Sequence, residues 1–363
     1  MISLYFNFFM KNTLLFLIFV LLLTACKEKV QTEKAVNHKV FTSVKIDTLL
    51  QEELSIRAIL IDSNKVWYAA NKGQYGSIDL VTDKRFSGHV IEDTLSLGFR
   101  SIAMTKDYIF MLNVGTPALL YRVSKDGSRI KKMYQENHPK AFYDSMQFWN
   151  DEEGIAMGDP TDNCLSVLIT RDGGITWNKI SCENLPKVDE GEAAFAASNT
   201  NLVVKGNDTW MVSGGKKSRV FYSPDKGKSW SVVNSPIVQG QAMTGIFTAD
   251  FYDAKNGFIA GGNYEKLNQN FGNKAITDNG GKTWKLIAEN EDFGYASCVQ
   301  YVPNSGGLQL VTVGASGLYY SSNSGEKWSK LLDDATLYTI RFMNDSTAIA
   351  AGKDKIVKVS FKH

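Results

Sequence analysis

Thr170-Arg171-Asp172-Gly173-Gly174-Ile175-Thr176-Trp177 is one of four segments that share the pattern Ser/Thr-x-Asp/Asn-x-Gly-x-Thr/Ser-Trp. The other copies cover Ser223–Trp230, Thr277–Trp284 and Ser321–Trp328, and a degenerate copy covers Ser124–Ser128. In this pattern a short acidic or amide side chain accepts hydrogen bonds from the turn amides, glycine adopts a left-handed conformation, and tryptophan covers the hairpin. We therefore expect a tight hairpin at each copy and a structural role for Asp172, Asp225 and Asp278.

A second repeat is an apolar strand that ends in small residues. Its copies end at Ala70, Gly115, Gly158, Gly214, Gly261, Gly314 and Gly352, at intervals of 38 to 56 residues. This spacing fits units of four short strands, as in the blades of a β-propeller. The last unit lacks one strand, which residues 39–47 can supply, and this pairing would leave no free sheet edge. The sequence thus predicts an all-β fold, a seven-bladed β-propeller over residues 39–363 in which the N-terminal strand closes the last blade. Six blades, as in sialidases, is the alternative.

The turn motif resembles the Asp-box (BNR) repeat of sialidases, sortilin-type receptors and photosystem II assembly factors. Over residues 55–361 the chain is similar to the photosystem II stability/assembly factor family, through the seven strand ends and the turn motifs. This resemblance implies a non-catalytic propeller that binds protein partners through a face bearing basic residues, with the turn motifs on the opposite side. Because nothing in the chain points to photosynthesis and its N-terminal segment indicates a heterotrophic cell envelope, the resemblance implies partner binding without naming the partner.

Residues 1–25 have the features of a bacterial lipoprotein signal peptide. An apolar run from Leu14 to Leu23 precedes Leu23-Thr24-Ala25-Cys26, which resembles a lipobox, so we expect lipidation at Cys26. The only charge in this segment is Lys11, which favours a start at Met10 over Met1. An ordinary signal peptide or a single membrane anchor is the alternative.

Residues 26–38 are rich in Lys, Glu and Gln and are expected to form a solvated, lipid-anchored tether. The expected location is the bacterial cell envelope. Lys27, directly after the lipidated cysteine, favours the outer membrane, on either its periplasmic or its surface side.

Charge and composition exclude several functional classes. The 40 basic and 38 acidic residues are spread along the chain and give a net charge of +2, so no basic stripe is available for nucleic acid. The four histidines are far apart and lack metal-ligand spacing, and no glycine-rich segment opens a helix after a strand. We therefore expect a monomer with no metal and no cofactor.

Candidate ligand-binding residues are those that the repeat places on the face formed by the loops entering each inner strand. They are Arg57, Arg100, Arg219, Tyr264 and Arg341. Three of the arginines, Arg57, Arg100 and Arg341, come from consecutive blades and could clamp an anion bidentately. The alternative is that each arginine pairs with a neighbouring acid such as Asp159 or Glu192, because a register slip of one residue turns a side chain to the other face.

The sequence favours a cell-envelope module that binds an anionic segment of a protein or glycan, anchored to the membrane through its lipid. The second hypothesis is a glycan-acting hydrolase of sialidase-like architecture, with Asp159, Glu192 or Asp250 as acid or base. No Arg-Ile-Pro segment begins the propeller, and nothing marks a tyrosine nucleophile with a glutamate base, which disfavours a sialidase. A sortilin-like receptor or spacer without a defined pocket is a third possibility.

Three cysteines remain after the lipobox: Cys164, Cys182 and Cys298. Cys164 and Cys182 are equidistant from Gly173 at the centre of a predicted turn, so a hairpin would place them opposite each other and allow a disulfide. Two unpaired buried thiols are the alternative.

Overall fold

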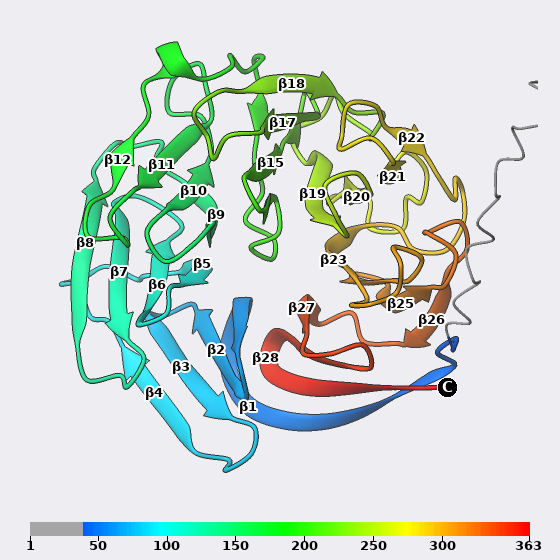
Figure 1. The fold of residues 1–363 in the computed structure, drawn as a ribbon, viewed down its shortest axis with the longest axis horizontal. Helices are drawn as coiled ribbons and strands as arrows, with labels where there is room; N and C mark the ends of the chain where they lie inside the picture. The colour runs from blue at the N-terminus through cyan, green and yellow to red at the C-terminus, as the bar shows by residue number, and fades with distance from the viewer. Residues whose placement is uncertain (1–38) are drawn as a thin grey trace, which may run out of the picture. The chain divides into compact units, whose positions relative to one another are not determined.

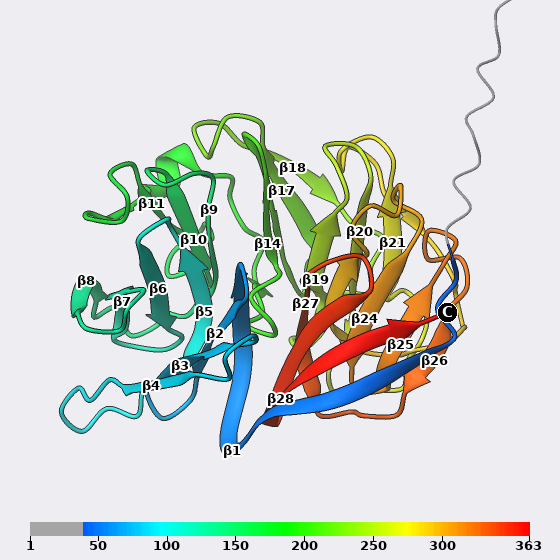
Figure 2. The same ribbon diagram turned by 60° about the horizontal axis from the view of Figure 1, so that its bottom comes forward.

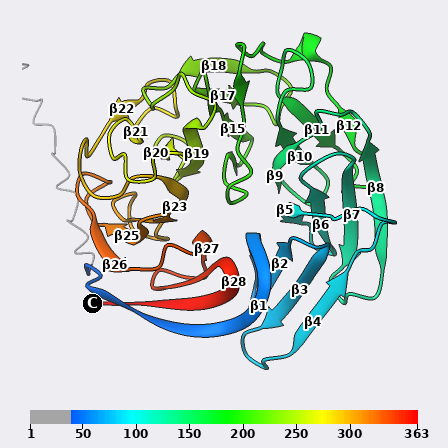
Figure 3. The same ribbon diagram turned by 180° about the vertical axis from the view of Figure 1, so that it is seen from behind.

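The computed structural model describes residues 39–363, of which Val40–His363 form one compact unit. The predicted signal peptide, the lipidation site Cys26, the tether and the choice of start codon lie outside these residues. The described chain is all β, with 28 strands and a single short 3-10 helix, η1 (Cys182–Asn184). The strands form sheets arranged in a ring, which Figures 1 and 3 show from its two sides. The predicted β-propeller is confirmed.

The strands form six hydrogen-bonded sheets. Four of these have four strands: β5 (Phe99–Met104), β6 (Tyr108–Asn113), β7 (Ala118–Ser124) and β8 (Ile130–Glu136); β9 (Tyr143–Phe148), β10 (Gly154–Gly158), β11 (Ser166–Thr170) and β12 (Asn178–Lys179); β14 (Leu202–Lys205), β15 (Asp208–Val212), β17 (Arg219–Ser223) and β18 (Ser231–Asn234); and β23 (Ala296–Tyr301), β24 (Leu310–Gly314), β25 (Gly317–Ser321) and β26 (Ser329–Leu332). The two others have six: β27 (Leu337–Phe342), β28 (Thr347–Lys362), β1 (Ser43–Asp62), β2 (Lys65–Ala70), β3 (Gln74–Asp79) and β4 (Arg85–His89); and β13 (Glu192–Ala193), β16 (Gly214–Gly215), β19 (Thr244–Phe251), β20 (Gly257–Asn263), β21 (Lys274–Thr277) and β22 (Lys285–Leu286).

The two ends of the described chain close the ring by pairing with each other. The first half of β1, from Ser43 to Ser55, pairs with the second half of β28, and the second half of β1 pairs with β2. Figure 2 shows β1 in blue running beside β28 in red. The ring thus has six continuous sheets, the number of the alternative expectation. The pairing register divides the sheet that holds both chain ends into two groups of four strand segments, which makes seven such groups in all.

Burial along the strands follows their distance from the middle of the ring. All five residues of β10 are buried, because neighbouring sheets cover both of its faces. The outer strand β4 alternates between exposed and half-buried residues, as expected for a strand with one face in water.

The four turn motifs share two hydrogen bonds. The side chain of the third residue accepts from the backbone N of the seventh, and the hydroxyl of the first residue accepts from the backbone N of the glycine in fifth place. In the first, the Asp172 carboxylate accepts from Thr176 N at 2.9 Å and from Thr176 Oγ1 at 2.6 Å, while Thr170 Oγ1 accepts from Gly174 N at 2.9 Å. Gly174 has a φ of 78°, and a Cβ there would lie 2.3 Å from the Phe110 ring. Asp225 repeats these bonds in the second motif.

In the third motif the structural role expected of Asp278 belongs to its neighbour. Asn279 Oδ1 accepts from Thr283 N at 3.0 Å, and Asn323 does the same from Lys327 N in the fourth motif. The prediction for Asp278 was therefore wrong by one position, because an amide oxygen serves this turn as well as a carboxylate.

The ring has two distinct faces. Because neighbouring strands are antiparallel, successive loops along the chain alternate between one face and the other. We call the face that carries the loops into each inner strand the cavity face, and the face that carries the turn motifs the hairpin face. The inner strands are β5, β9, β14, β19, β23, β27 and the second half of β1. Of these, Figure 1 labels β5, β9, β19, β23 and β27 near the middle of the ring.

The segment Ala194–Asn201, which we call the plug, fills the middle of the ring. Residues 196–201 are all buried. Ser198 Oγ donates to Ser297 O at 2.5 Å, Asn199 Nδ2 donates to Ile102 O at 2.8 Å, and Ala249 N donates to Thr200 O at 2.8 Å. These bonds reach inner strands from across the ring, so the plug closes the central channel.

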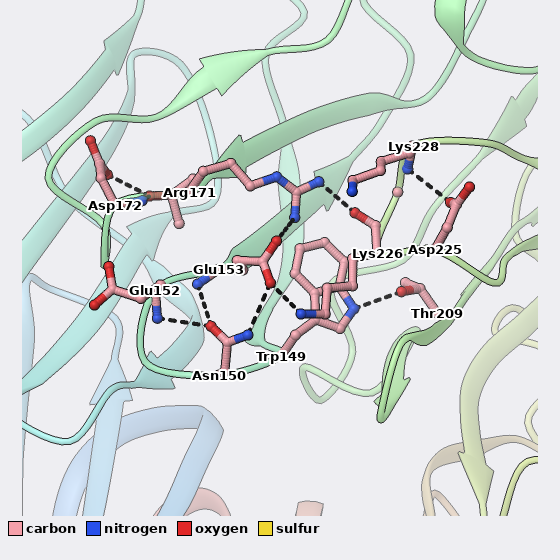
Figure 4. Close-up of polar contacts among 12 residues, drawn as sticks. Trp149, Asn150, Glu152, Glu153, Arg171, Asp172, Thr209, Asp225, Lys226 and Lys228 are labelled. Carbon is pink, nitrogen blue, oxygen red and sulfur yellow. Dashed lines mark hydrogen bonds and ion pairs between the residues drawn. The ribbon is translucent and has the colours of Figure 1, made fainter.

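On the hairpin face, an ion-pair network joins two neighbouring sheets (Figure 4). Glu153 lies between Arg171, at 2.8 Å, and Lys226. Arg171 also donates to Lys226 O at 2.6 Å, and Trp149 Nε1 donates to Thr209 Oγ1 at 2.8 Å. The bond to Lys226 is the main cause that lowers the pKa of Glu153 to about 2. The charges of Arg171 and Lys226 are thus both paired with that of Glu153, and their contacts link the two sheets.

Candidate functional site

A cavity of about 450 Å³ opens on the cavity face, above the plug. Loops and strand ends from much of the ring contribute to its walls. It is lined by Arg57, Arg100, Phe142, Asp159, Ala193, Ala194, Phe195, Ala196, Ala197, Ala242, Met243, Phe247, Tyr264 and Tyr295. Small side chains leave the space open, and the lining also contains two arginines, one aspartate and five aromatic residues. This is the size and composition of a ligand site.

A β-bulge at the same position of six inner strands positions the residues around this mouth. At each bulge two residues of the inner strand face one residue of the next strand, and the extra side chain is re-aimed. The extra residues are Arg57, Arg100, Asp144, Phe247, Ser297 and Tyr338. The bulges therefore explain why residues from distant parts of the chain meet here.

Arg57 and Arg100 lie at the base of the cavity without a carboxylate partner. Arg57 Nη1 donates to Ala197 O of the plug at 3.1 Å, and its guanidinium lies 4.1 Å from the centre of the Tyr338 ring. Arg100 Nη1 makes one long bond of 3.5 Å to Ala196 O. Burial, together with repulsion from Arg57, lowers the pKa of Arg100. None of the ion pairs in residues 39–363 involves either arginine.

Four aromatic rings form one wall of the cavity. Phe195 stacks on Phe247 with centroids 3.9 Å apart, and Tyr264 and Tyr295 meet edge to face at 5.1 Å. Tyr264 directly follows β20 and keeps 43% of its surface exposed. The predicted ligand residue Tyr264 thus reaches the same cavity as Arg57 and Arg100.

Asp159 is the only one of the three candidate acids that lines this cavity. Its Oδ1 accepts from Ala194 N at 2.7 Å, and burial raises its pKa to about 6. Glu192 instead pairs with Arg219 at 2.5 Å and accepts from Ser213 Oγ. Asp250 lies near the hairpin face, where it accepts from Tyr301 N at 2.7 Å and its pKa is raised by burial. The three acids are therefore not brought together.

Asp144 is a buried acid that the sequence analysis missed. It is fully buried, and neither carboxylate oxygen has a hydrogen-bond partner. Burial, and then the nearby charge of Asp159, raise its pKa well above the usual range. It occupies the same bulge position as Arg57 and Arg100, and that alignment was the signal that could have found it.

Two of the predicted arginines lie elsewhere. Arg341 is near the far end of β27 and lines a smaller polar cavity toward the hairpin face, where its Nη2 donates to Ser198 O at 3.0 Å. It lies four residues beyond the start of its strand, whereas Arg57 and Arg100 lie at the bulges. Arg219 is paired with Glu192, whose carboxylate neutralises its charge.

A disulfide joins Cys164 and Cys182, with Cα atoms 5.5 Å apart. Cys164 lies in the loop before β11 and Cys182 begins η1 after β12, so the bond ties the two ends of this hairpin together. Cys298 is a buried free thiol. Residues 39–363 contain no cluster of three or more His, Cys, Asp or Glu able to hold a metal ion, and no helix able to cross a membrane.

Comparison with solved structures gives clear matches for the fold. A structure of YCF48 bound to D1 peptide matches 90% of this chain and 99% of its own, with a TM-score of 0.64 and 13% sequence identity. This chain has a β-propeller fold similar to that of YCF48. YCF48 from Cyanidioschyzon merolae matches 88% of the chain and 98% of its own, at a TM-score of 0.62 and 12% identity.

The WD40 β-propeller domain of Doa1 is also similar, with a TM-score of 0.60, 12% identity, and coverage of 89% of this chain and 98% of that domain. No protein-family model and no curated protein sequence matches the chain. At these identities the likeness to YCF48 and Doa1 concerns the fold.

Proposed function

We propose that this protein is a lipid-anchored module of the bacterial cell envelope that binds an anionic segment of a partner protein in the cavity above the plug. The observation that carries the proposal is the pair Arg57 and Arg100, which line the cavity and donate hydrogen bonds only to backbone carbonyls of the plug, with no ion pair to a carboxylate among residues 39–363. Guanidinium groups in partly desolvated sites bind oxyanions strongly, so a carboxylate ligand would supply the missing charge. The YCF48 structure with D1 peptide supports peptide binding by a propeller of this shape.

The turn motifs support placing the chain among Asp-box propellers. Their side chains are committed to the turns themselves, on the face opposite the cavity. This leaves the cavity face for the partner.

The experiment is a charge reversal of the two cavity arginines, Arg57→Glu with Arg100→Glu, in the full-length protein. Partner capture from envelope extracts of the native cell should be lost, while the matched control Lys228→Glu on the hairpin face should capture the partner as the wild type does. Equal thermal melting of the three proteins checks that they fold. Undiminished capture by the double variant would place the site elsewhere.

Anchoring is tested separately at Cys26. Metabolic labelling with a fatty acid should mark the wild type and leave Cys26→Ala unlabelled. Fractionation of the labelled cells on a density gradient then tests the outer membrane against the inner one. Labelling of Cys26→Ala would contradict lipidation at this residue.

A glycan-acting hydrolase is the competing hypothesis. Asp159 has a raised pKa suited to a general acid, yet glycosidases of the common kind need two carboxylates on either side of the scissile bond. Asp159 is the only acid lining the cavity. Turnover of a panel of fluorogenic glycosides, lost in Asp159→Asn, would favour the hydrolase over the binding module.

A further inference from the structure

A second cavity of about 210 Å³ adjoins the first on the cavity face. It is lined by Arg57, Tyr264, Leu267, Tyr295, Ser297, Gly314, Ala315, Ala335, Leu337 and Tyr338. Three of these residues, Arg57, Tyr264 and Tyr295, line both cavities, so they form a ridge between them. One short segment of chain can therefore cross the ridge and reach both cavities.

The second cavity differs from the first in chemistry. Leu267, Leu337 and the Tyr338 ring provide apolar walls, and small residues at 314, 315 and 335 leave the space open. The Ser297 hydroxyl already has partners within the protein, because its single proton lies between two carbonyl acceptors, Val313 O at 3.0 Å and Tyr338 O at 2.8 Å from Oγ. Arg57 is the one charged residue among the lining residues, and its guanidinium stacks on Tyr338.

Two of the lining side chains are apolar and open to solvent. Tyr264 and Leu267, on the loop after β20, are 43% and 41% exposed, and Phe271 on the same loop is 50% exposed. Large apolar side chains grouped at the surface mark sites of association.

We propose that the partner segment carries a large apolar side chain next to its anionic group, and that this side chain enters the second cavity. The inference rests on the proposed function and specifies the ligand further. The anionic group belongs in the larger cavity, because Arg100 lines only that one. A dry cavity of roughly 150 Å³ holds a benzene molecule, so the second cavity has room for a leucine or phenylalanine side chain. Ala315 is then a specificity-determining residue.

The test is selection of peptides from a displayed library of random decapeptides on the immobilised full-length protein. The wild type should enrich peptides in which Asp or Glu stands at a fixed spacing from Leu, Phe, Ile or Met. In a synthetic peptide of the enriched sequence, alanine in place of the apolar residue should weaken binding about tenfold.

Two cavity variants separate the two halves of the ligand. Ala315→Leu fills the second cavity, so it should bind the enriched peptide and its alanine analogue equally while still preferring acidic peptides. Arg100→Gln should lose the preference for acids and keep the apolar preference. Ala254→Leu, on the hairpin face, is the matched control and should behave as the wild type. Where Ala315→Leu fails to fold, Ala335→Leu fills the same cavity from its other side.

The outcomes distinguish this inference from the function on which it rests. Enrichment of acidic peptides without an apolar preference, or an apolar preference that survives in folded Ala315→Leu or Ala335→Leu, overturns the second-cavity proposal and leaves the anion site standing. Enrichment that does not depend on acidic residues or on Arg100 overturns both.

Discussion

The cavity face and the hairpin face use the same cationic side chains in opposite ways. On the hairpin face, Arg171 and Lys226 are both paired with Glu153, and their charges join two sheets. On the cavity face, Arg57 and Arg100 lie beside backbone carbonyls of the plug and have no acid partner. Paired charges of the first kind stabilise the fold, whereas desolvated cations of the second kind are held ready for an external anion. This difference indicates that the cavity face binds the ligand and that the hairpin face stabilises the fold.

The largest effect on stability is expected from the disulfide on the cavity face. Replacing both cysteines, Cys164→Ser with Cys182→Ser, opens a loop with a sequence separation of 18 residues. Loop-closure entropy then predicts a loss of about 3 kcal/mol in the free energy of unfolding. Urea denaturation should show this loss, and the wild type under reducing conditions should fall to the same value. An unchanged midpoint would mean that hydrogen bonds alone hold this loop.

The next largest effect on stability is expected from Asp144 on the cavity face. In contrast to the paired charges of the hairpin face, this buried acid without a hydrogen-bond partner lowers the free energy of unfolding when it is ionised. Its pKa is raised in the folded state. Above the pH at which free carboxyls titrate, the folded protein therefore still holds a proton on Asp144 that the unfolded chain has lost, and folding takes up this proton. Wild-type stability should therefore fall with increasing pH, and Asp144→Asn should lessen that fall, because Asp159 and Asp250 also have raised pKa values and continue to contribute to it. We expect Asp144→Asn to be more stable than the wild type by about 2 kcal/mol at pH 6 and by little at pH 4. Parallel stability curves for the two proteins would contradict the raised pKa.

Glu153→Gln on the hairpin face should lower the free energy of unfolding by about 1–2 kcal/mol at pH 7, because it leaves Arg171 and Lys226 without their acid. The folded-state pKa of Glu153 is lowered to about 2, so its contribution is present at neutral pH and lost as pH falls from about 4.5 toward 2. Denaturation of the variant and the wild type at pH 7 and pH 2 measures the difference. Peptide binding at the cavity should stay unchanged, and a weakened affinity would mean that the two faces are coupled.

The smallest effect is expected from Asp159, the acid that shares the cavity with the two arginines. Its pKa of about 6 means that it is mostly ionised at pH 7.5 and mostly protonated at pH 5. An acidic peptide should bind the wild type about three- to tenfold more tightly at the lower pH, provided that the peptide carboxylate stays ionised. Asp159→Asn should bind tightly at both values. Fluorescence anisotropy of a labelled peptide, measured between about pH 5 and pH 7.5, checks this prediction. If Asp159→Asn keeps the pH dependence of binding, Asp159 is not the group that causes it.

The repeats made the propeller predictable, because each turn motif specifies a hairpin from local chemistry alone. Trp177 and Gly174 need only their own neighbours in the chain to form the turn. The sheet count was harder, since β1 pairs with β28 in one four-stranded group and with β2 in the next, and so joins the two groups into one sheet. Nothing in the residue pattern marks where such a long strand changes partner.

The candidate site was predictable in part. Arg57, Arg100, Tyr264 and Asp159 were all identified from the repeat and meet in one cavity. Arg341 was placed with them because it too lies in an inner strand, yet its position along that strand sends it to the other end of the channel. The bulges that bring in Phe247, Ser297 and Tyr338 depend on tertiary pairing, which a single strand does not reveal.

The plug also escaped prediction. Its sequence, Ala194 to Asn201, reads as an ordinary loop of small and polar residues. Its role comes from the partners that it meets on strands more than 90 residues away, such as Ser297 and Ile102. Long-range backbone bonds of this kind are set by the assembled ring rather than by the local pattern.

The pairing of β1 with β28 sets the order in which the ring can be completed. Residues 43–55 pair with residues 353–362, so this strand finds its partner only after the sheets between them in the sequence have been synthesised. A nascent chain stopped before this point keeps a solvent-exposed strand edge, and extensions fused after His363 emerge beside the seam. Relocating the termini to a surface turn between two other sheets would make this seam covalent, and in such a circular permutant β1 could pair with β28 as soon as both had been synthesised.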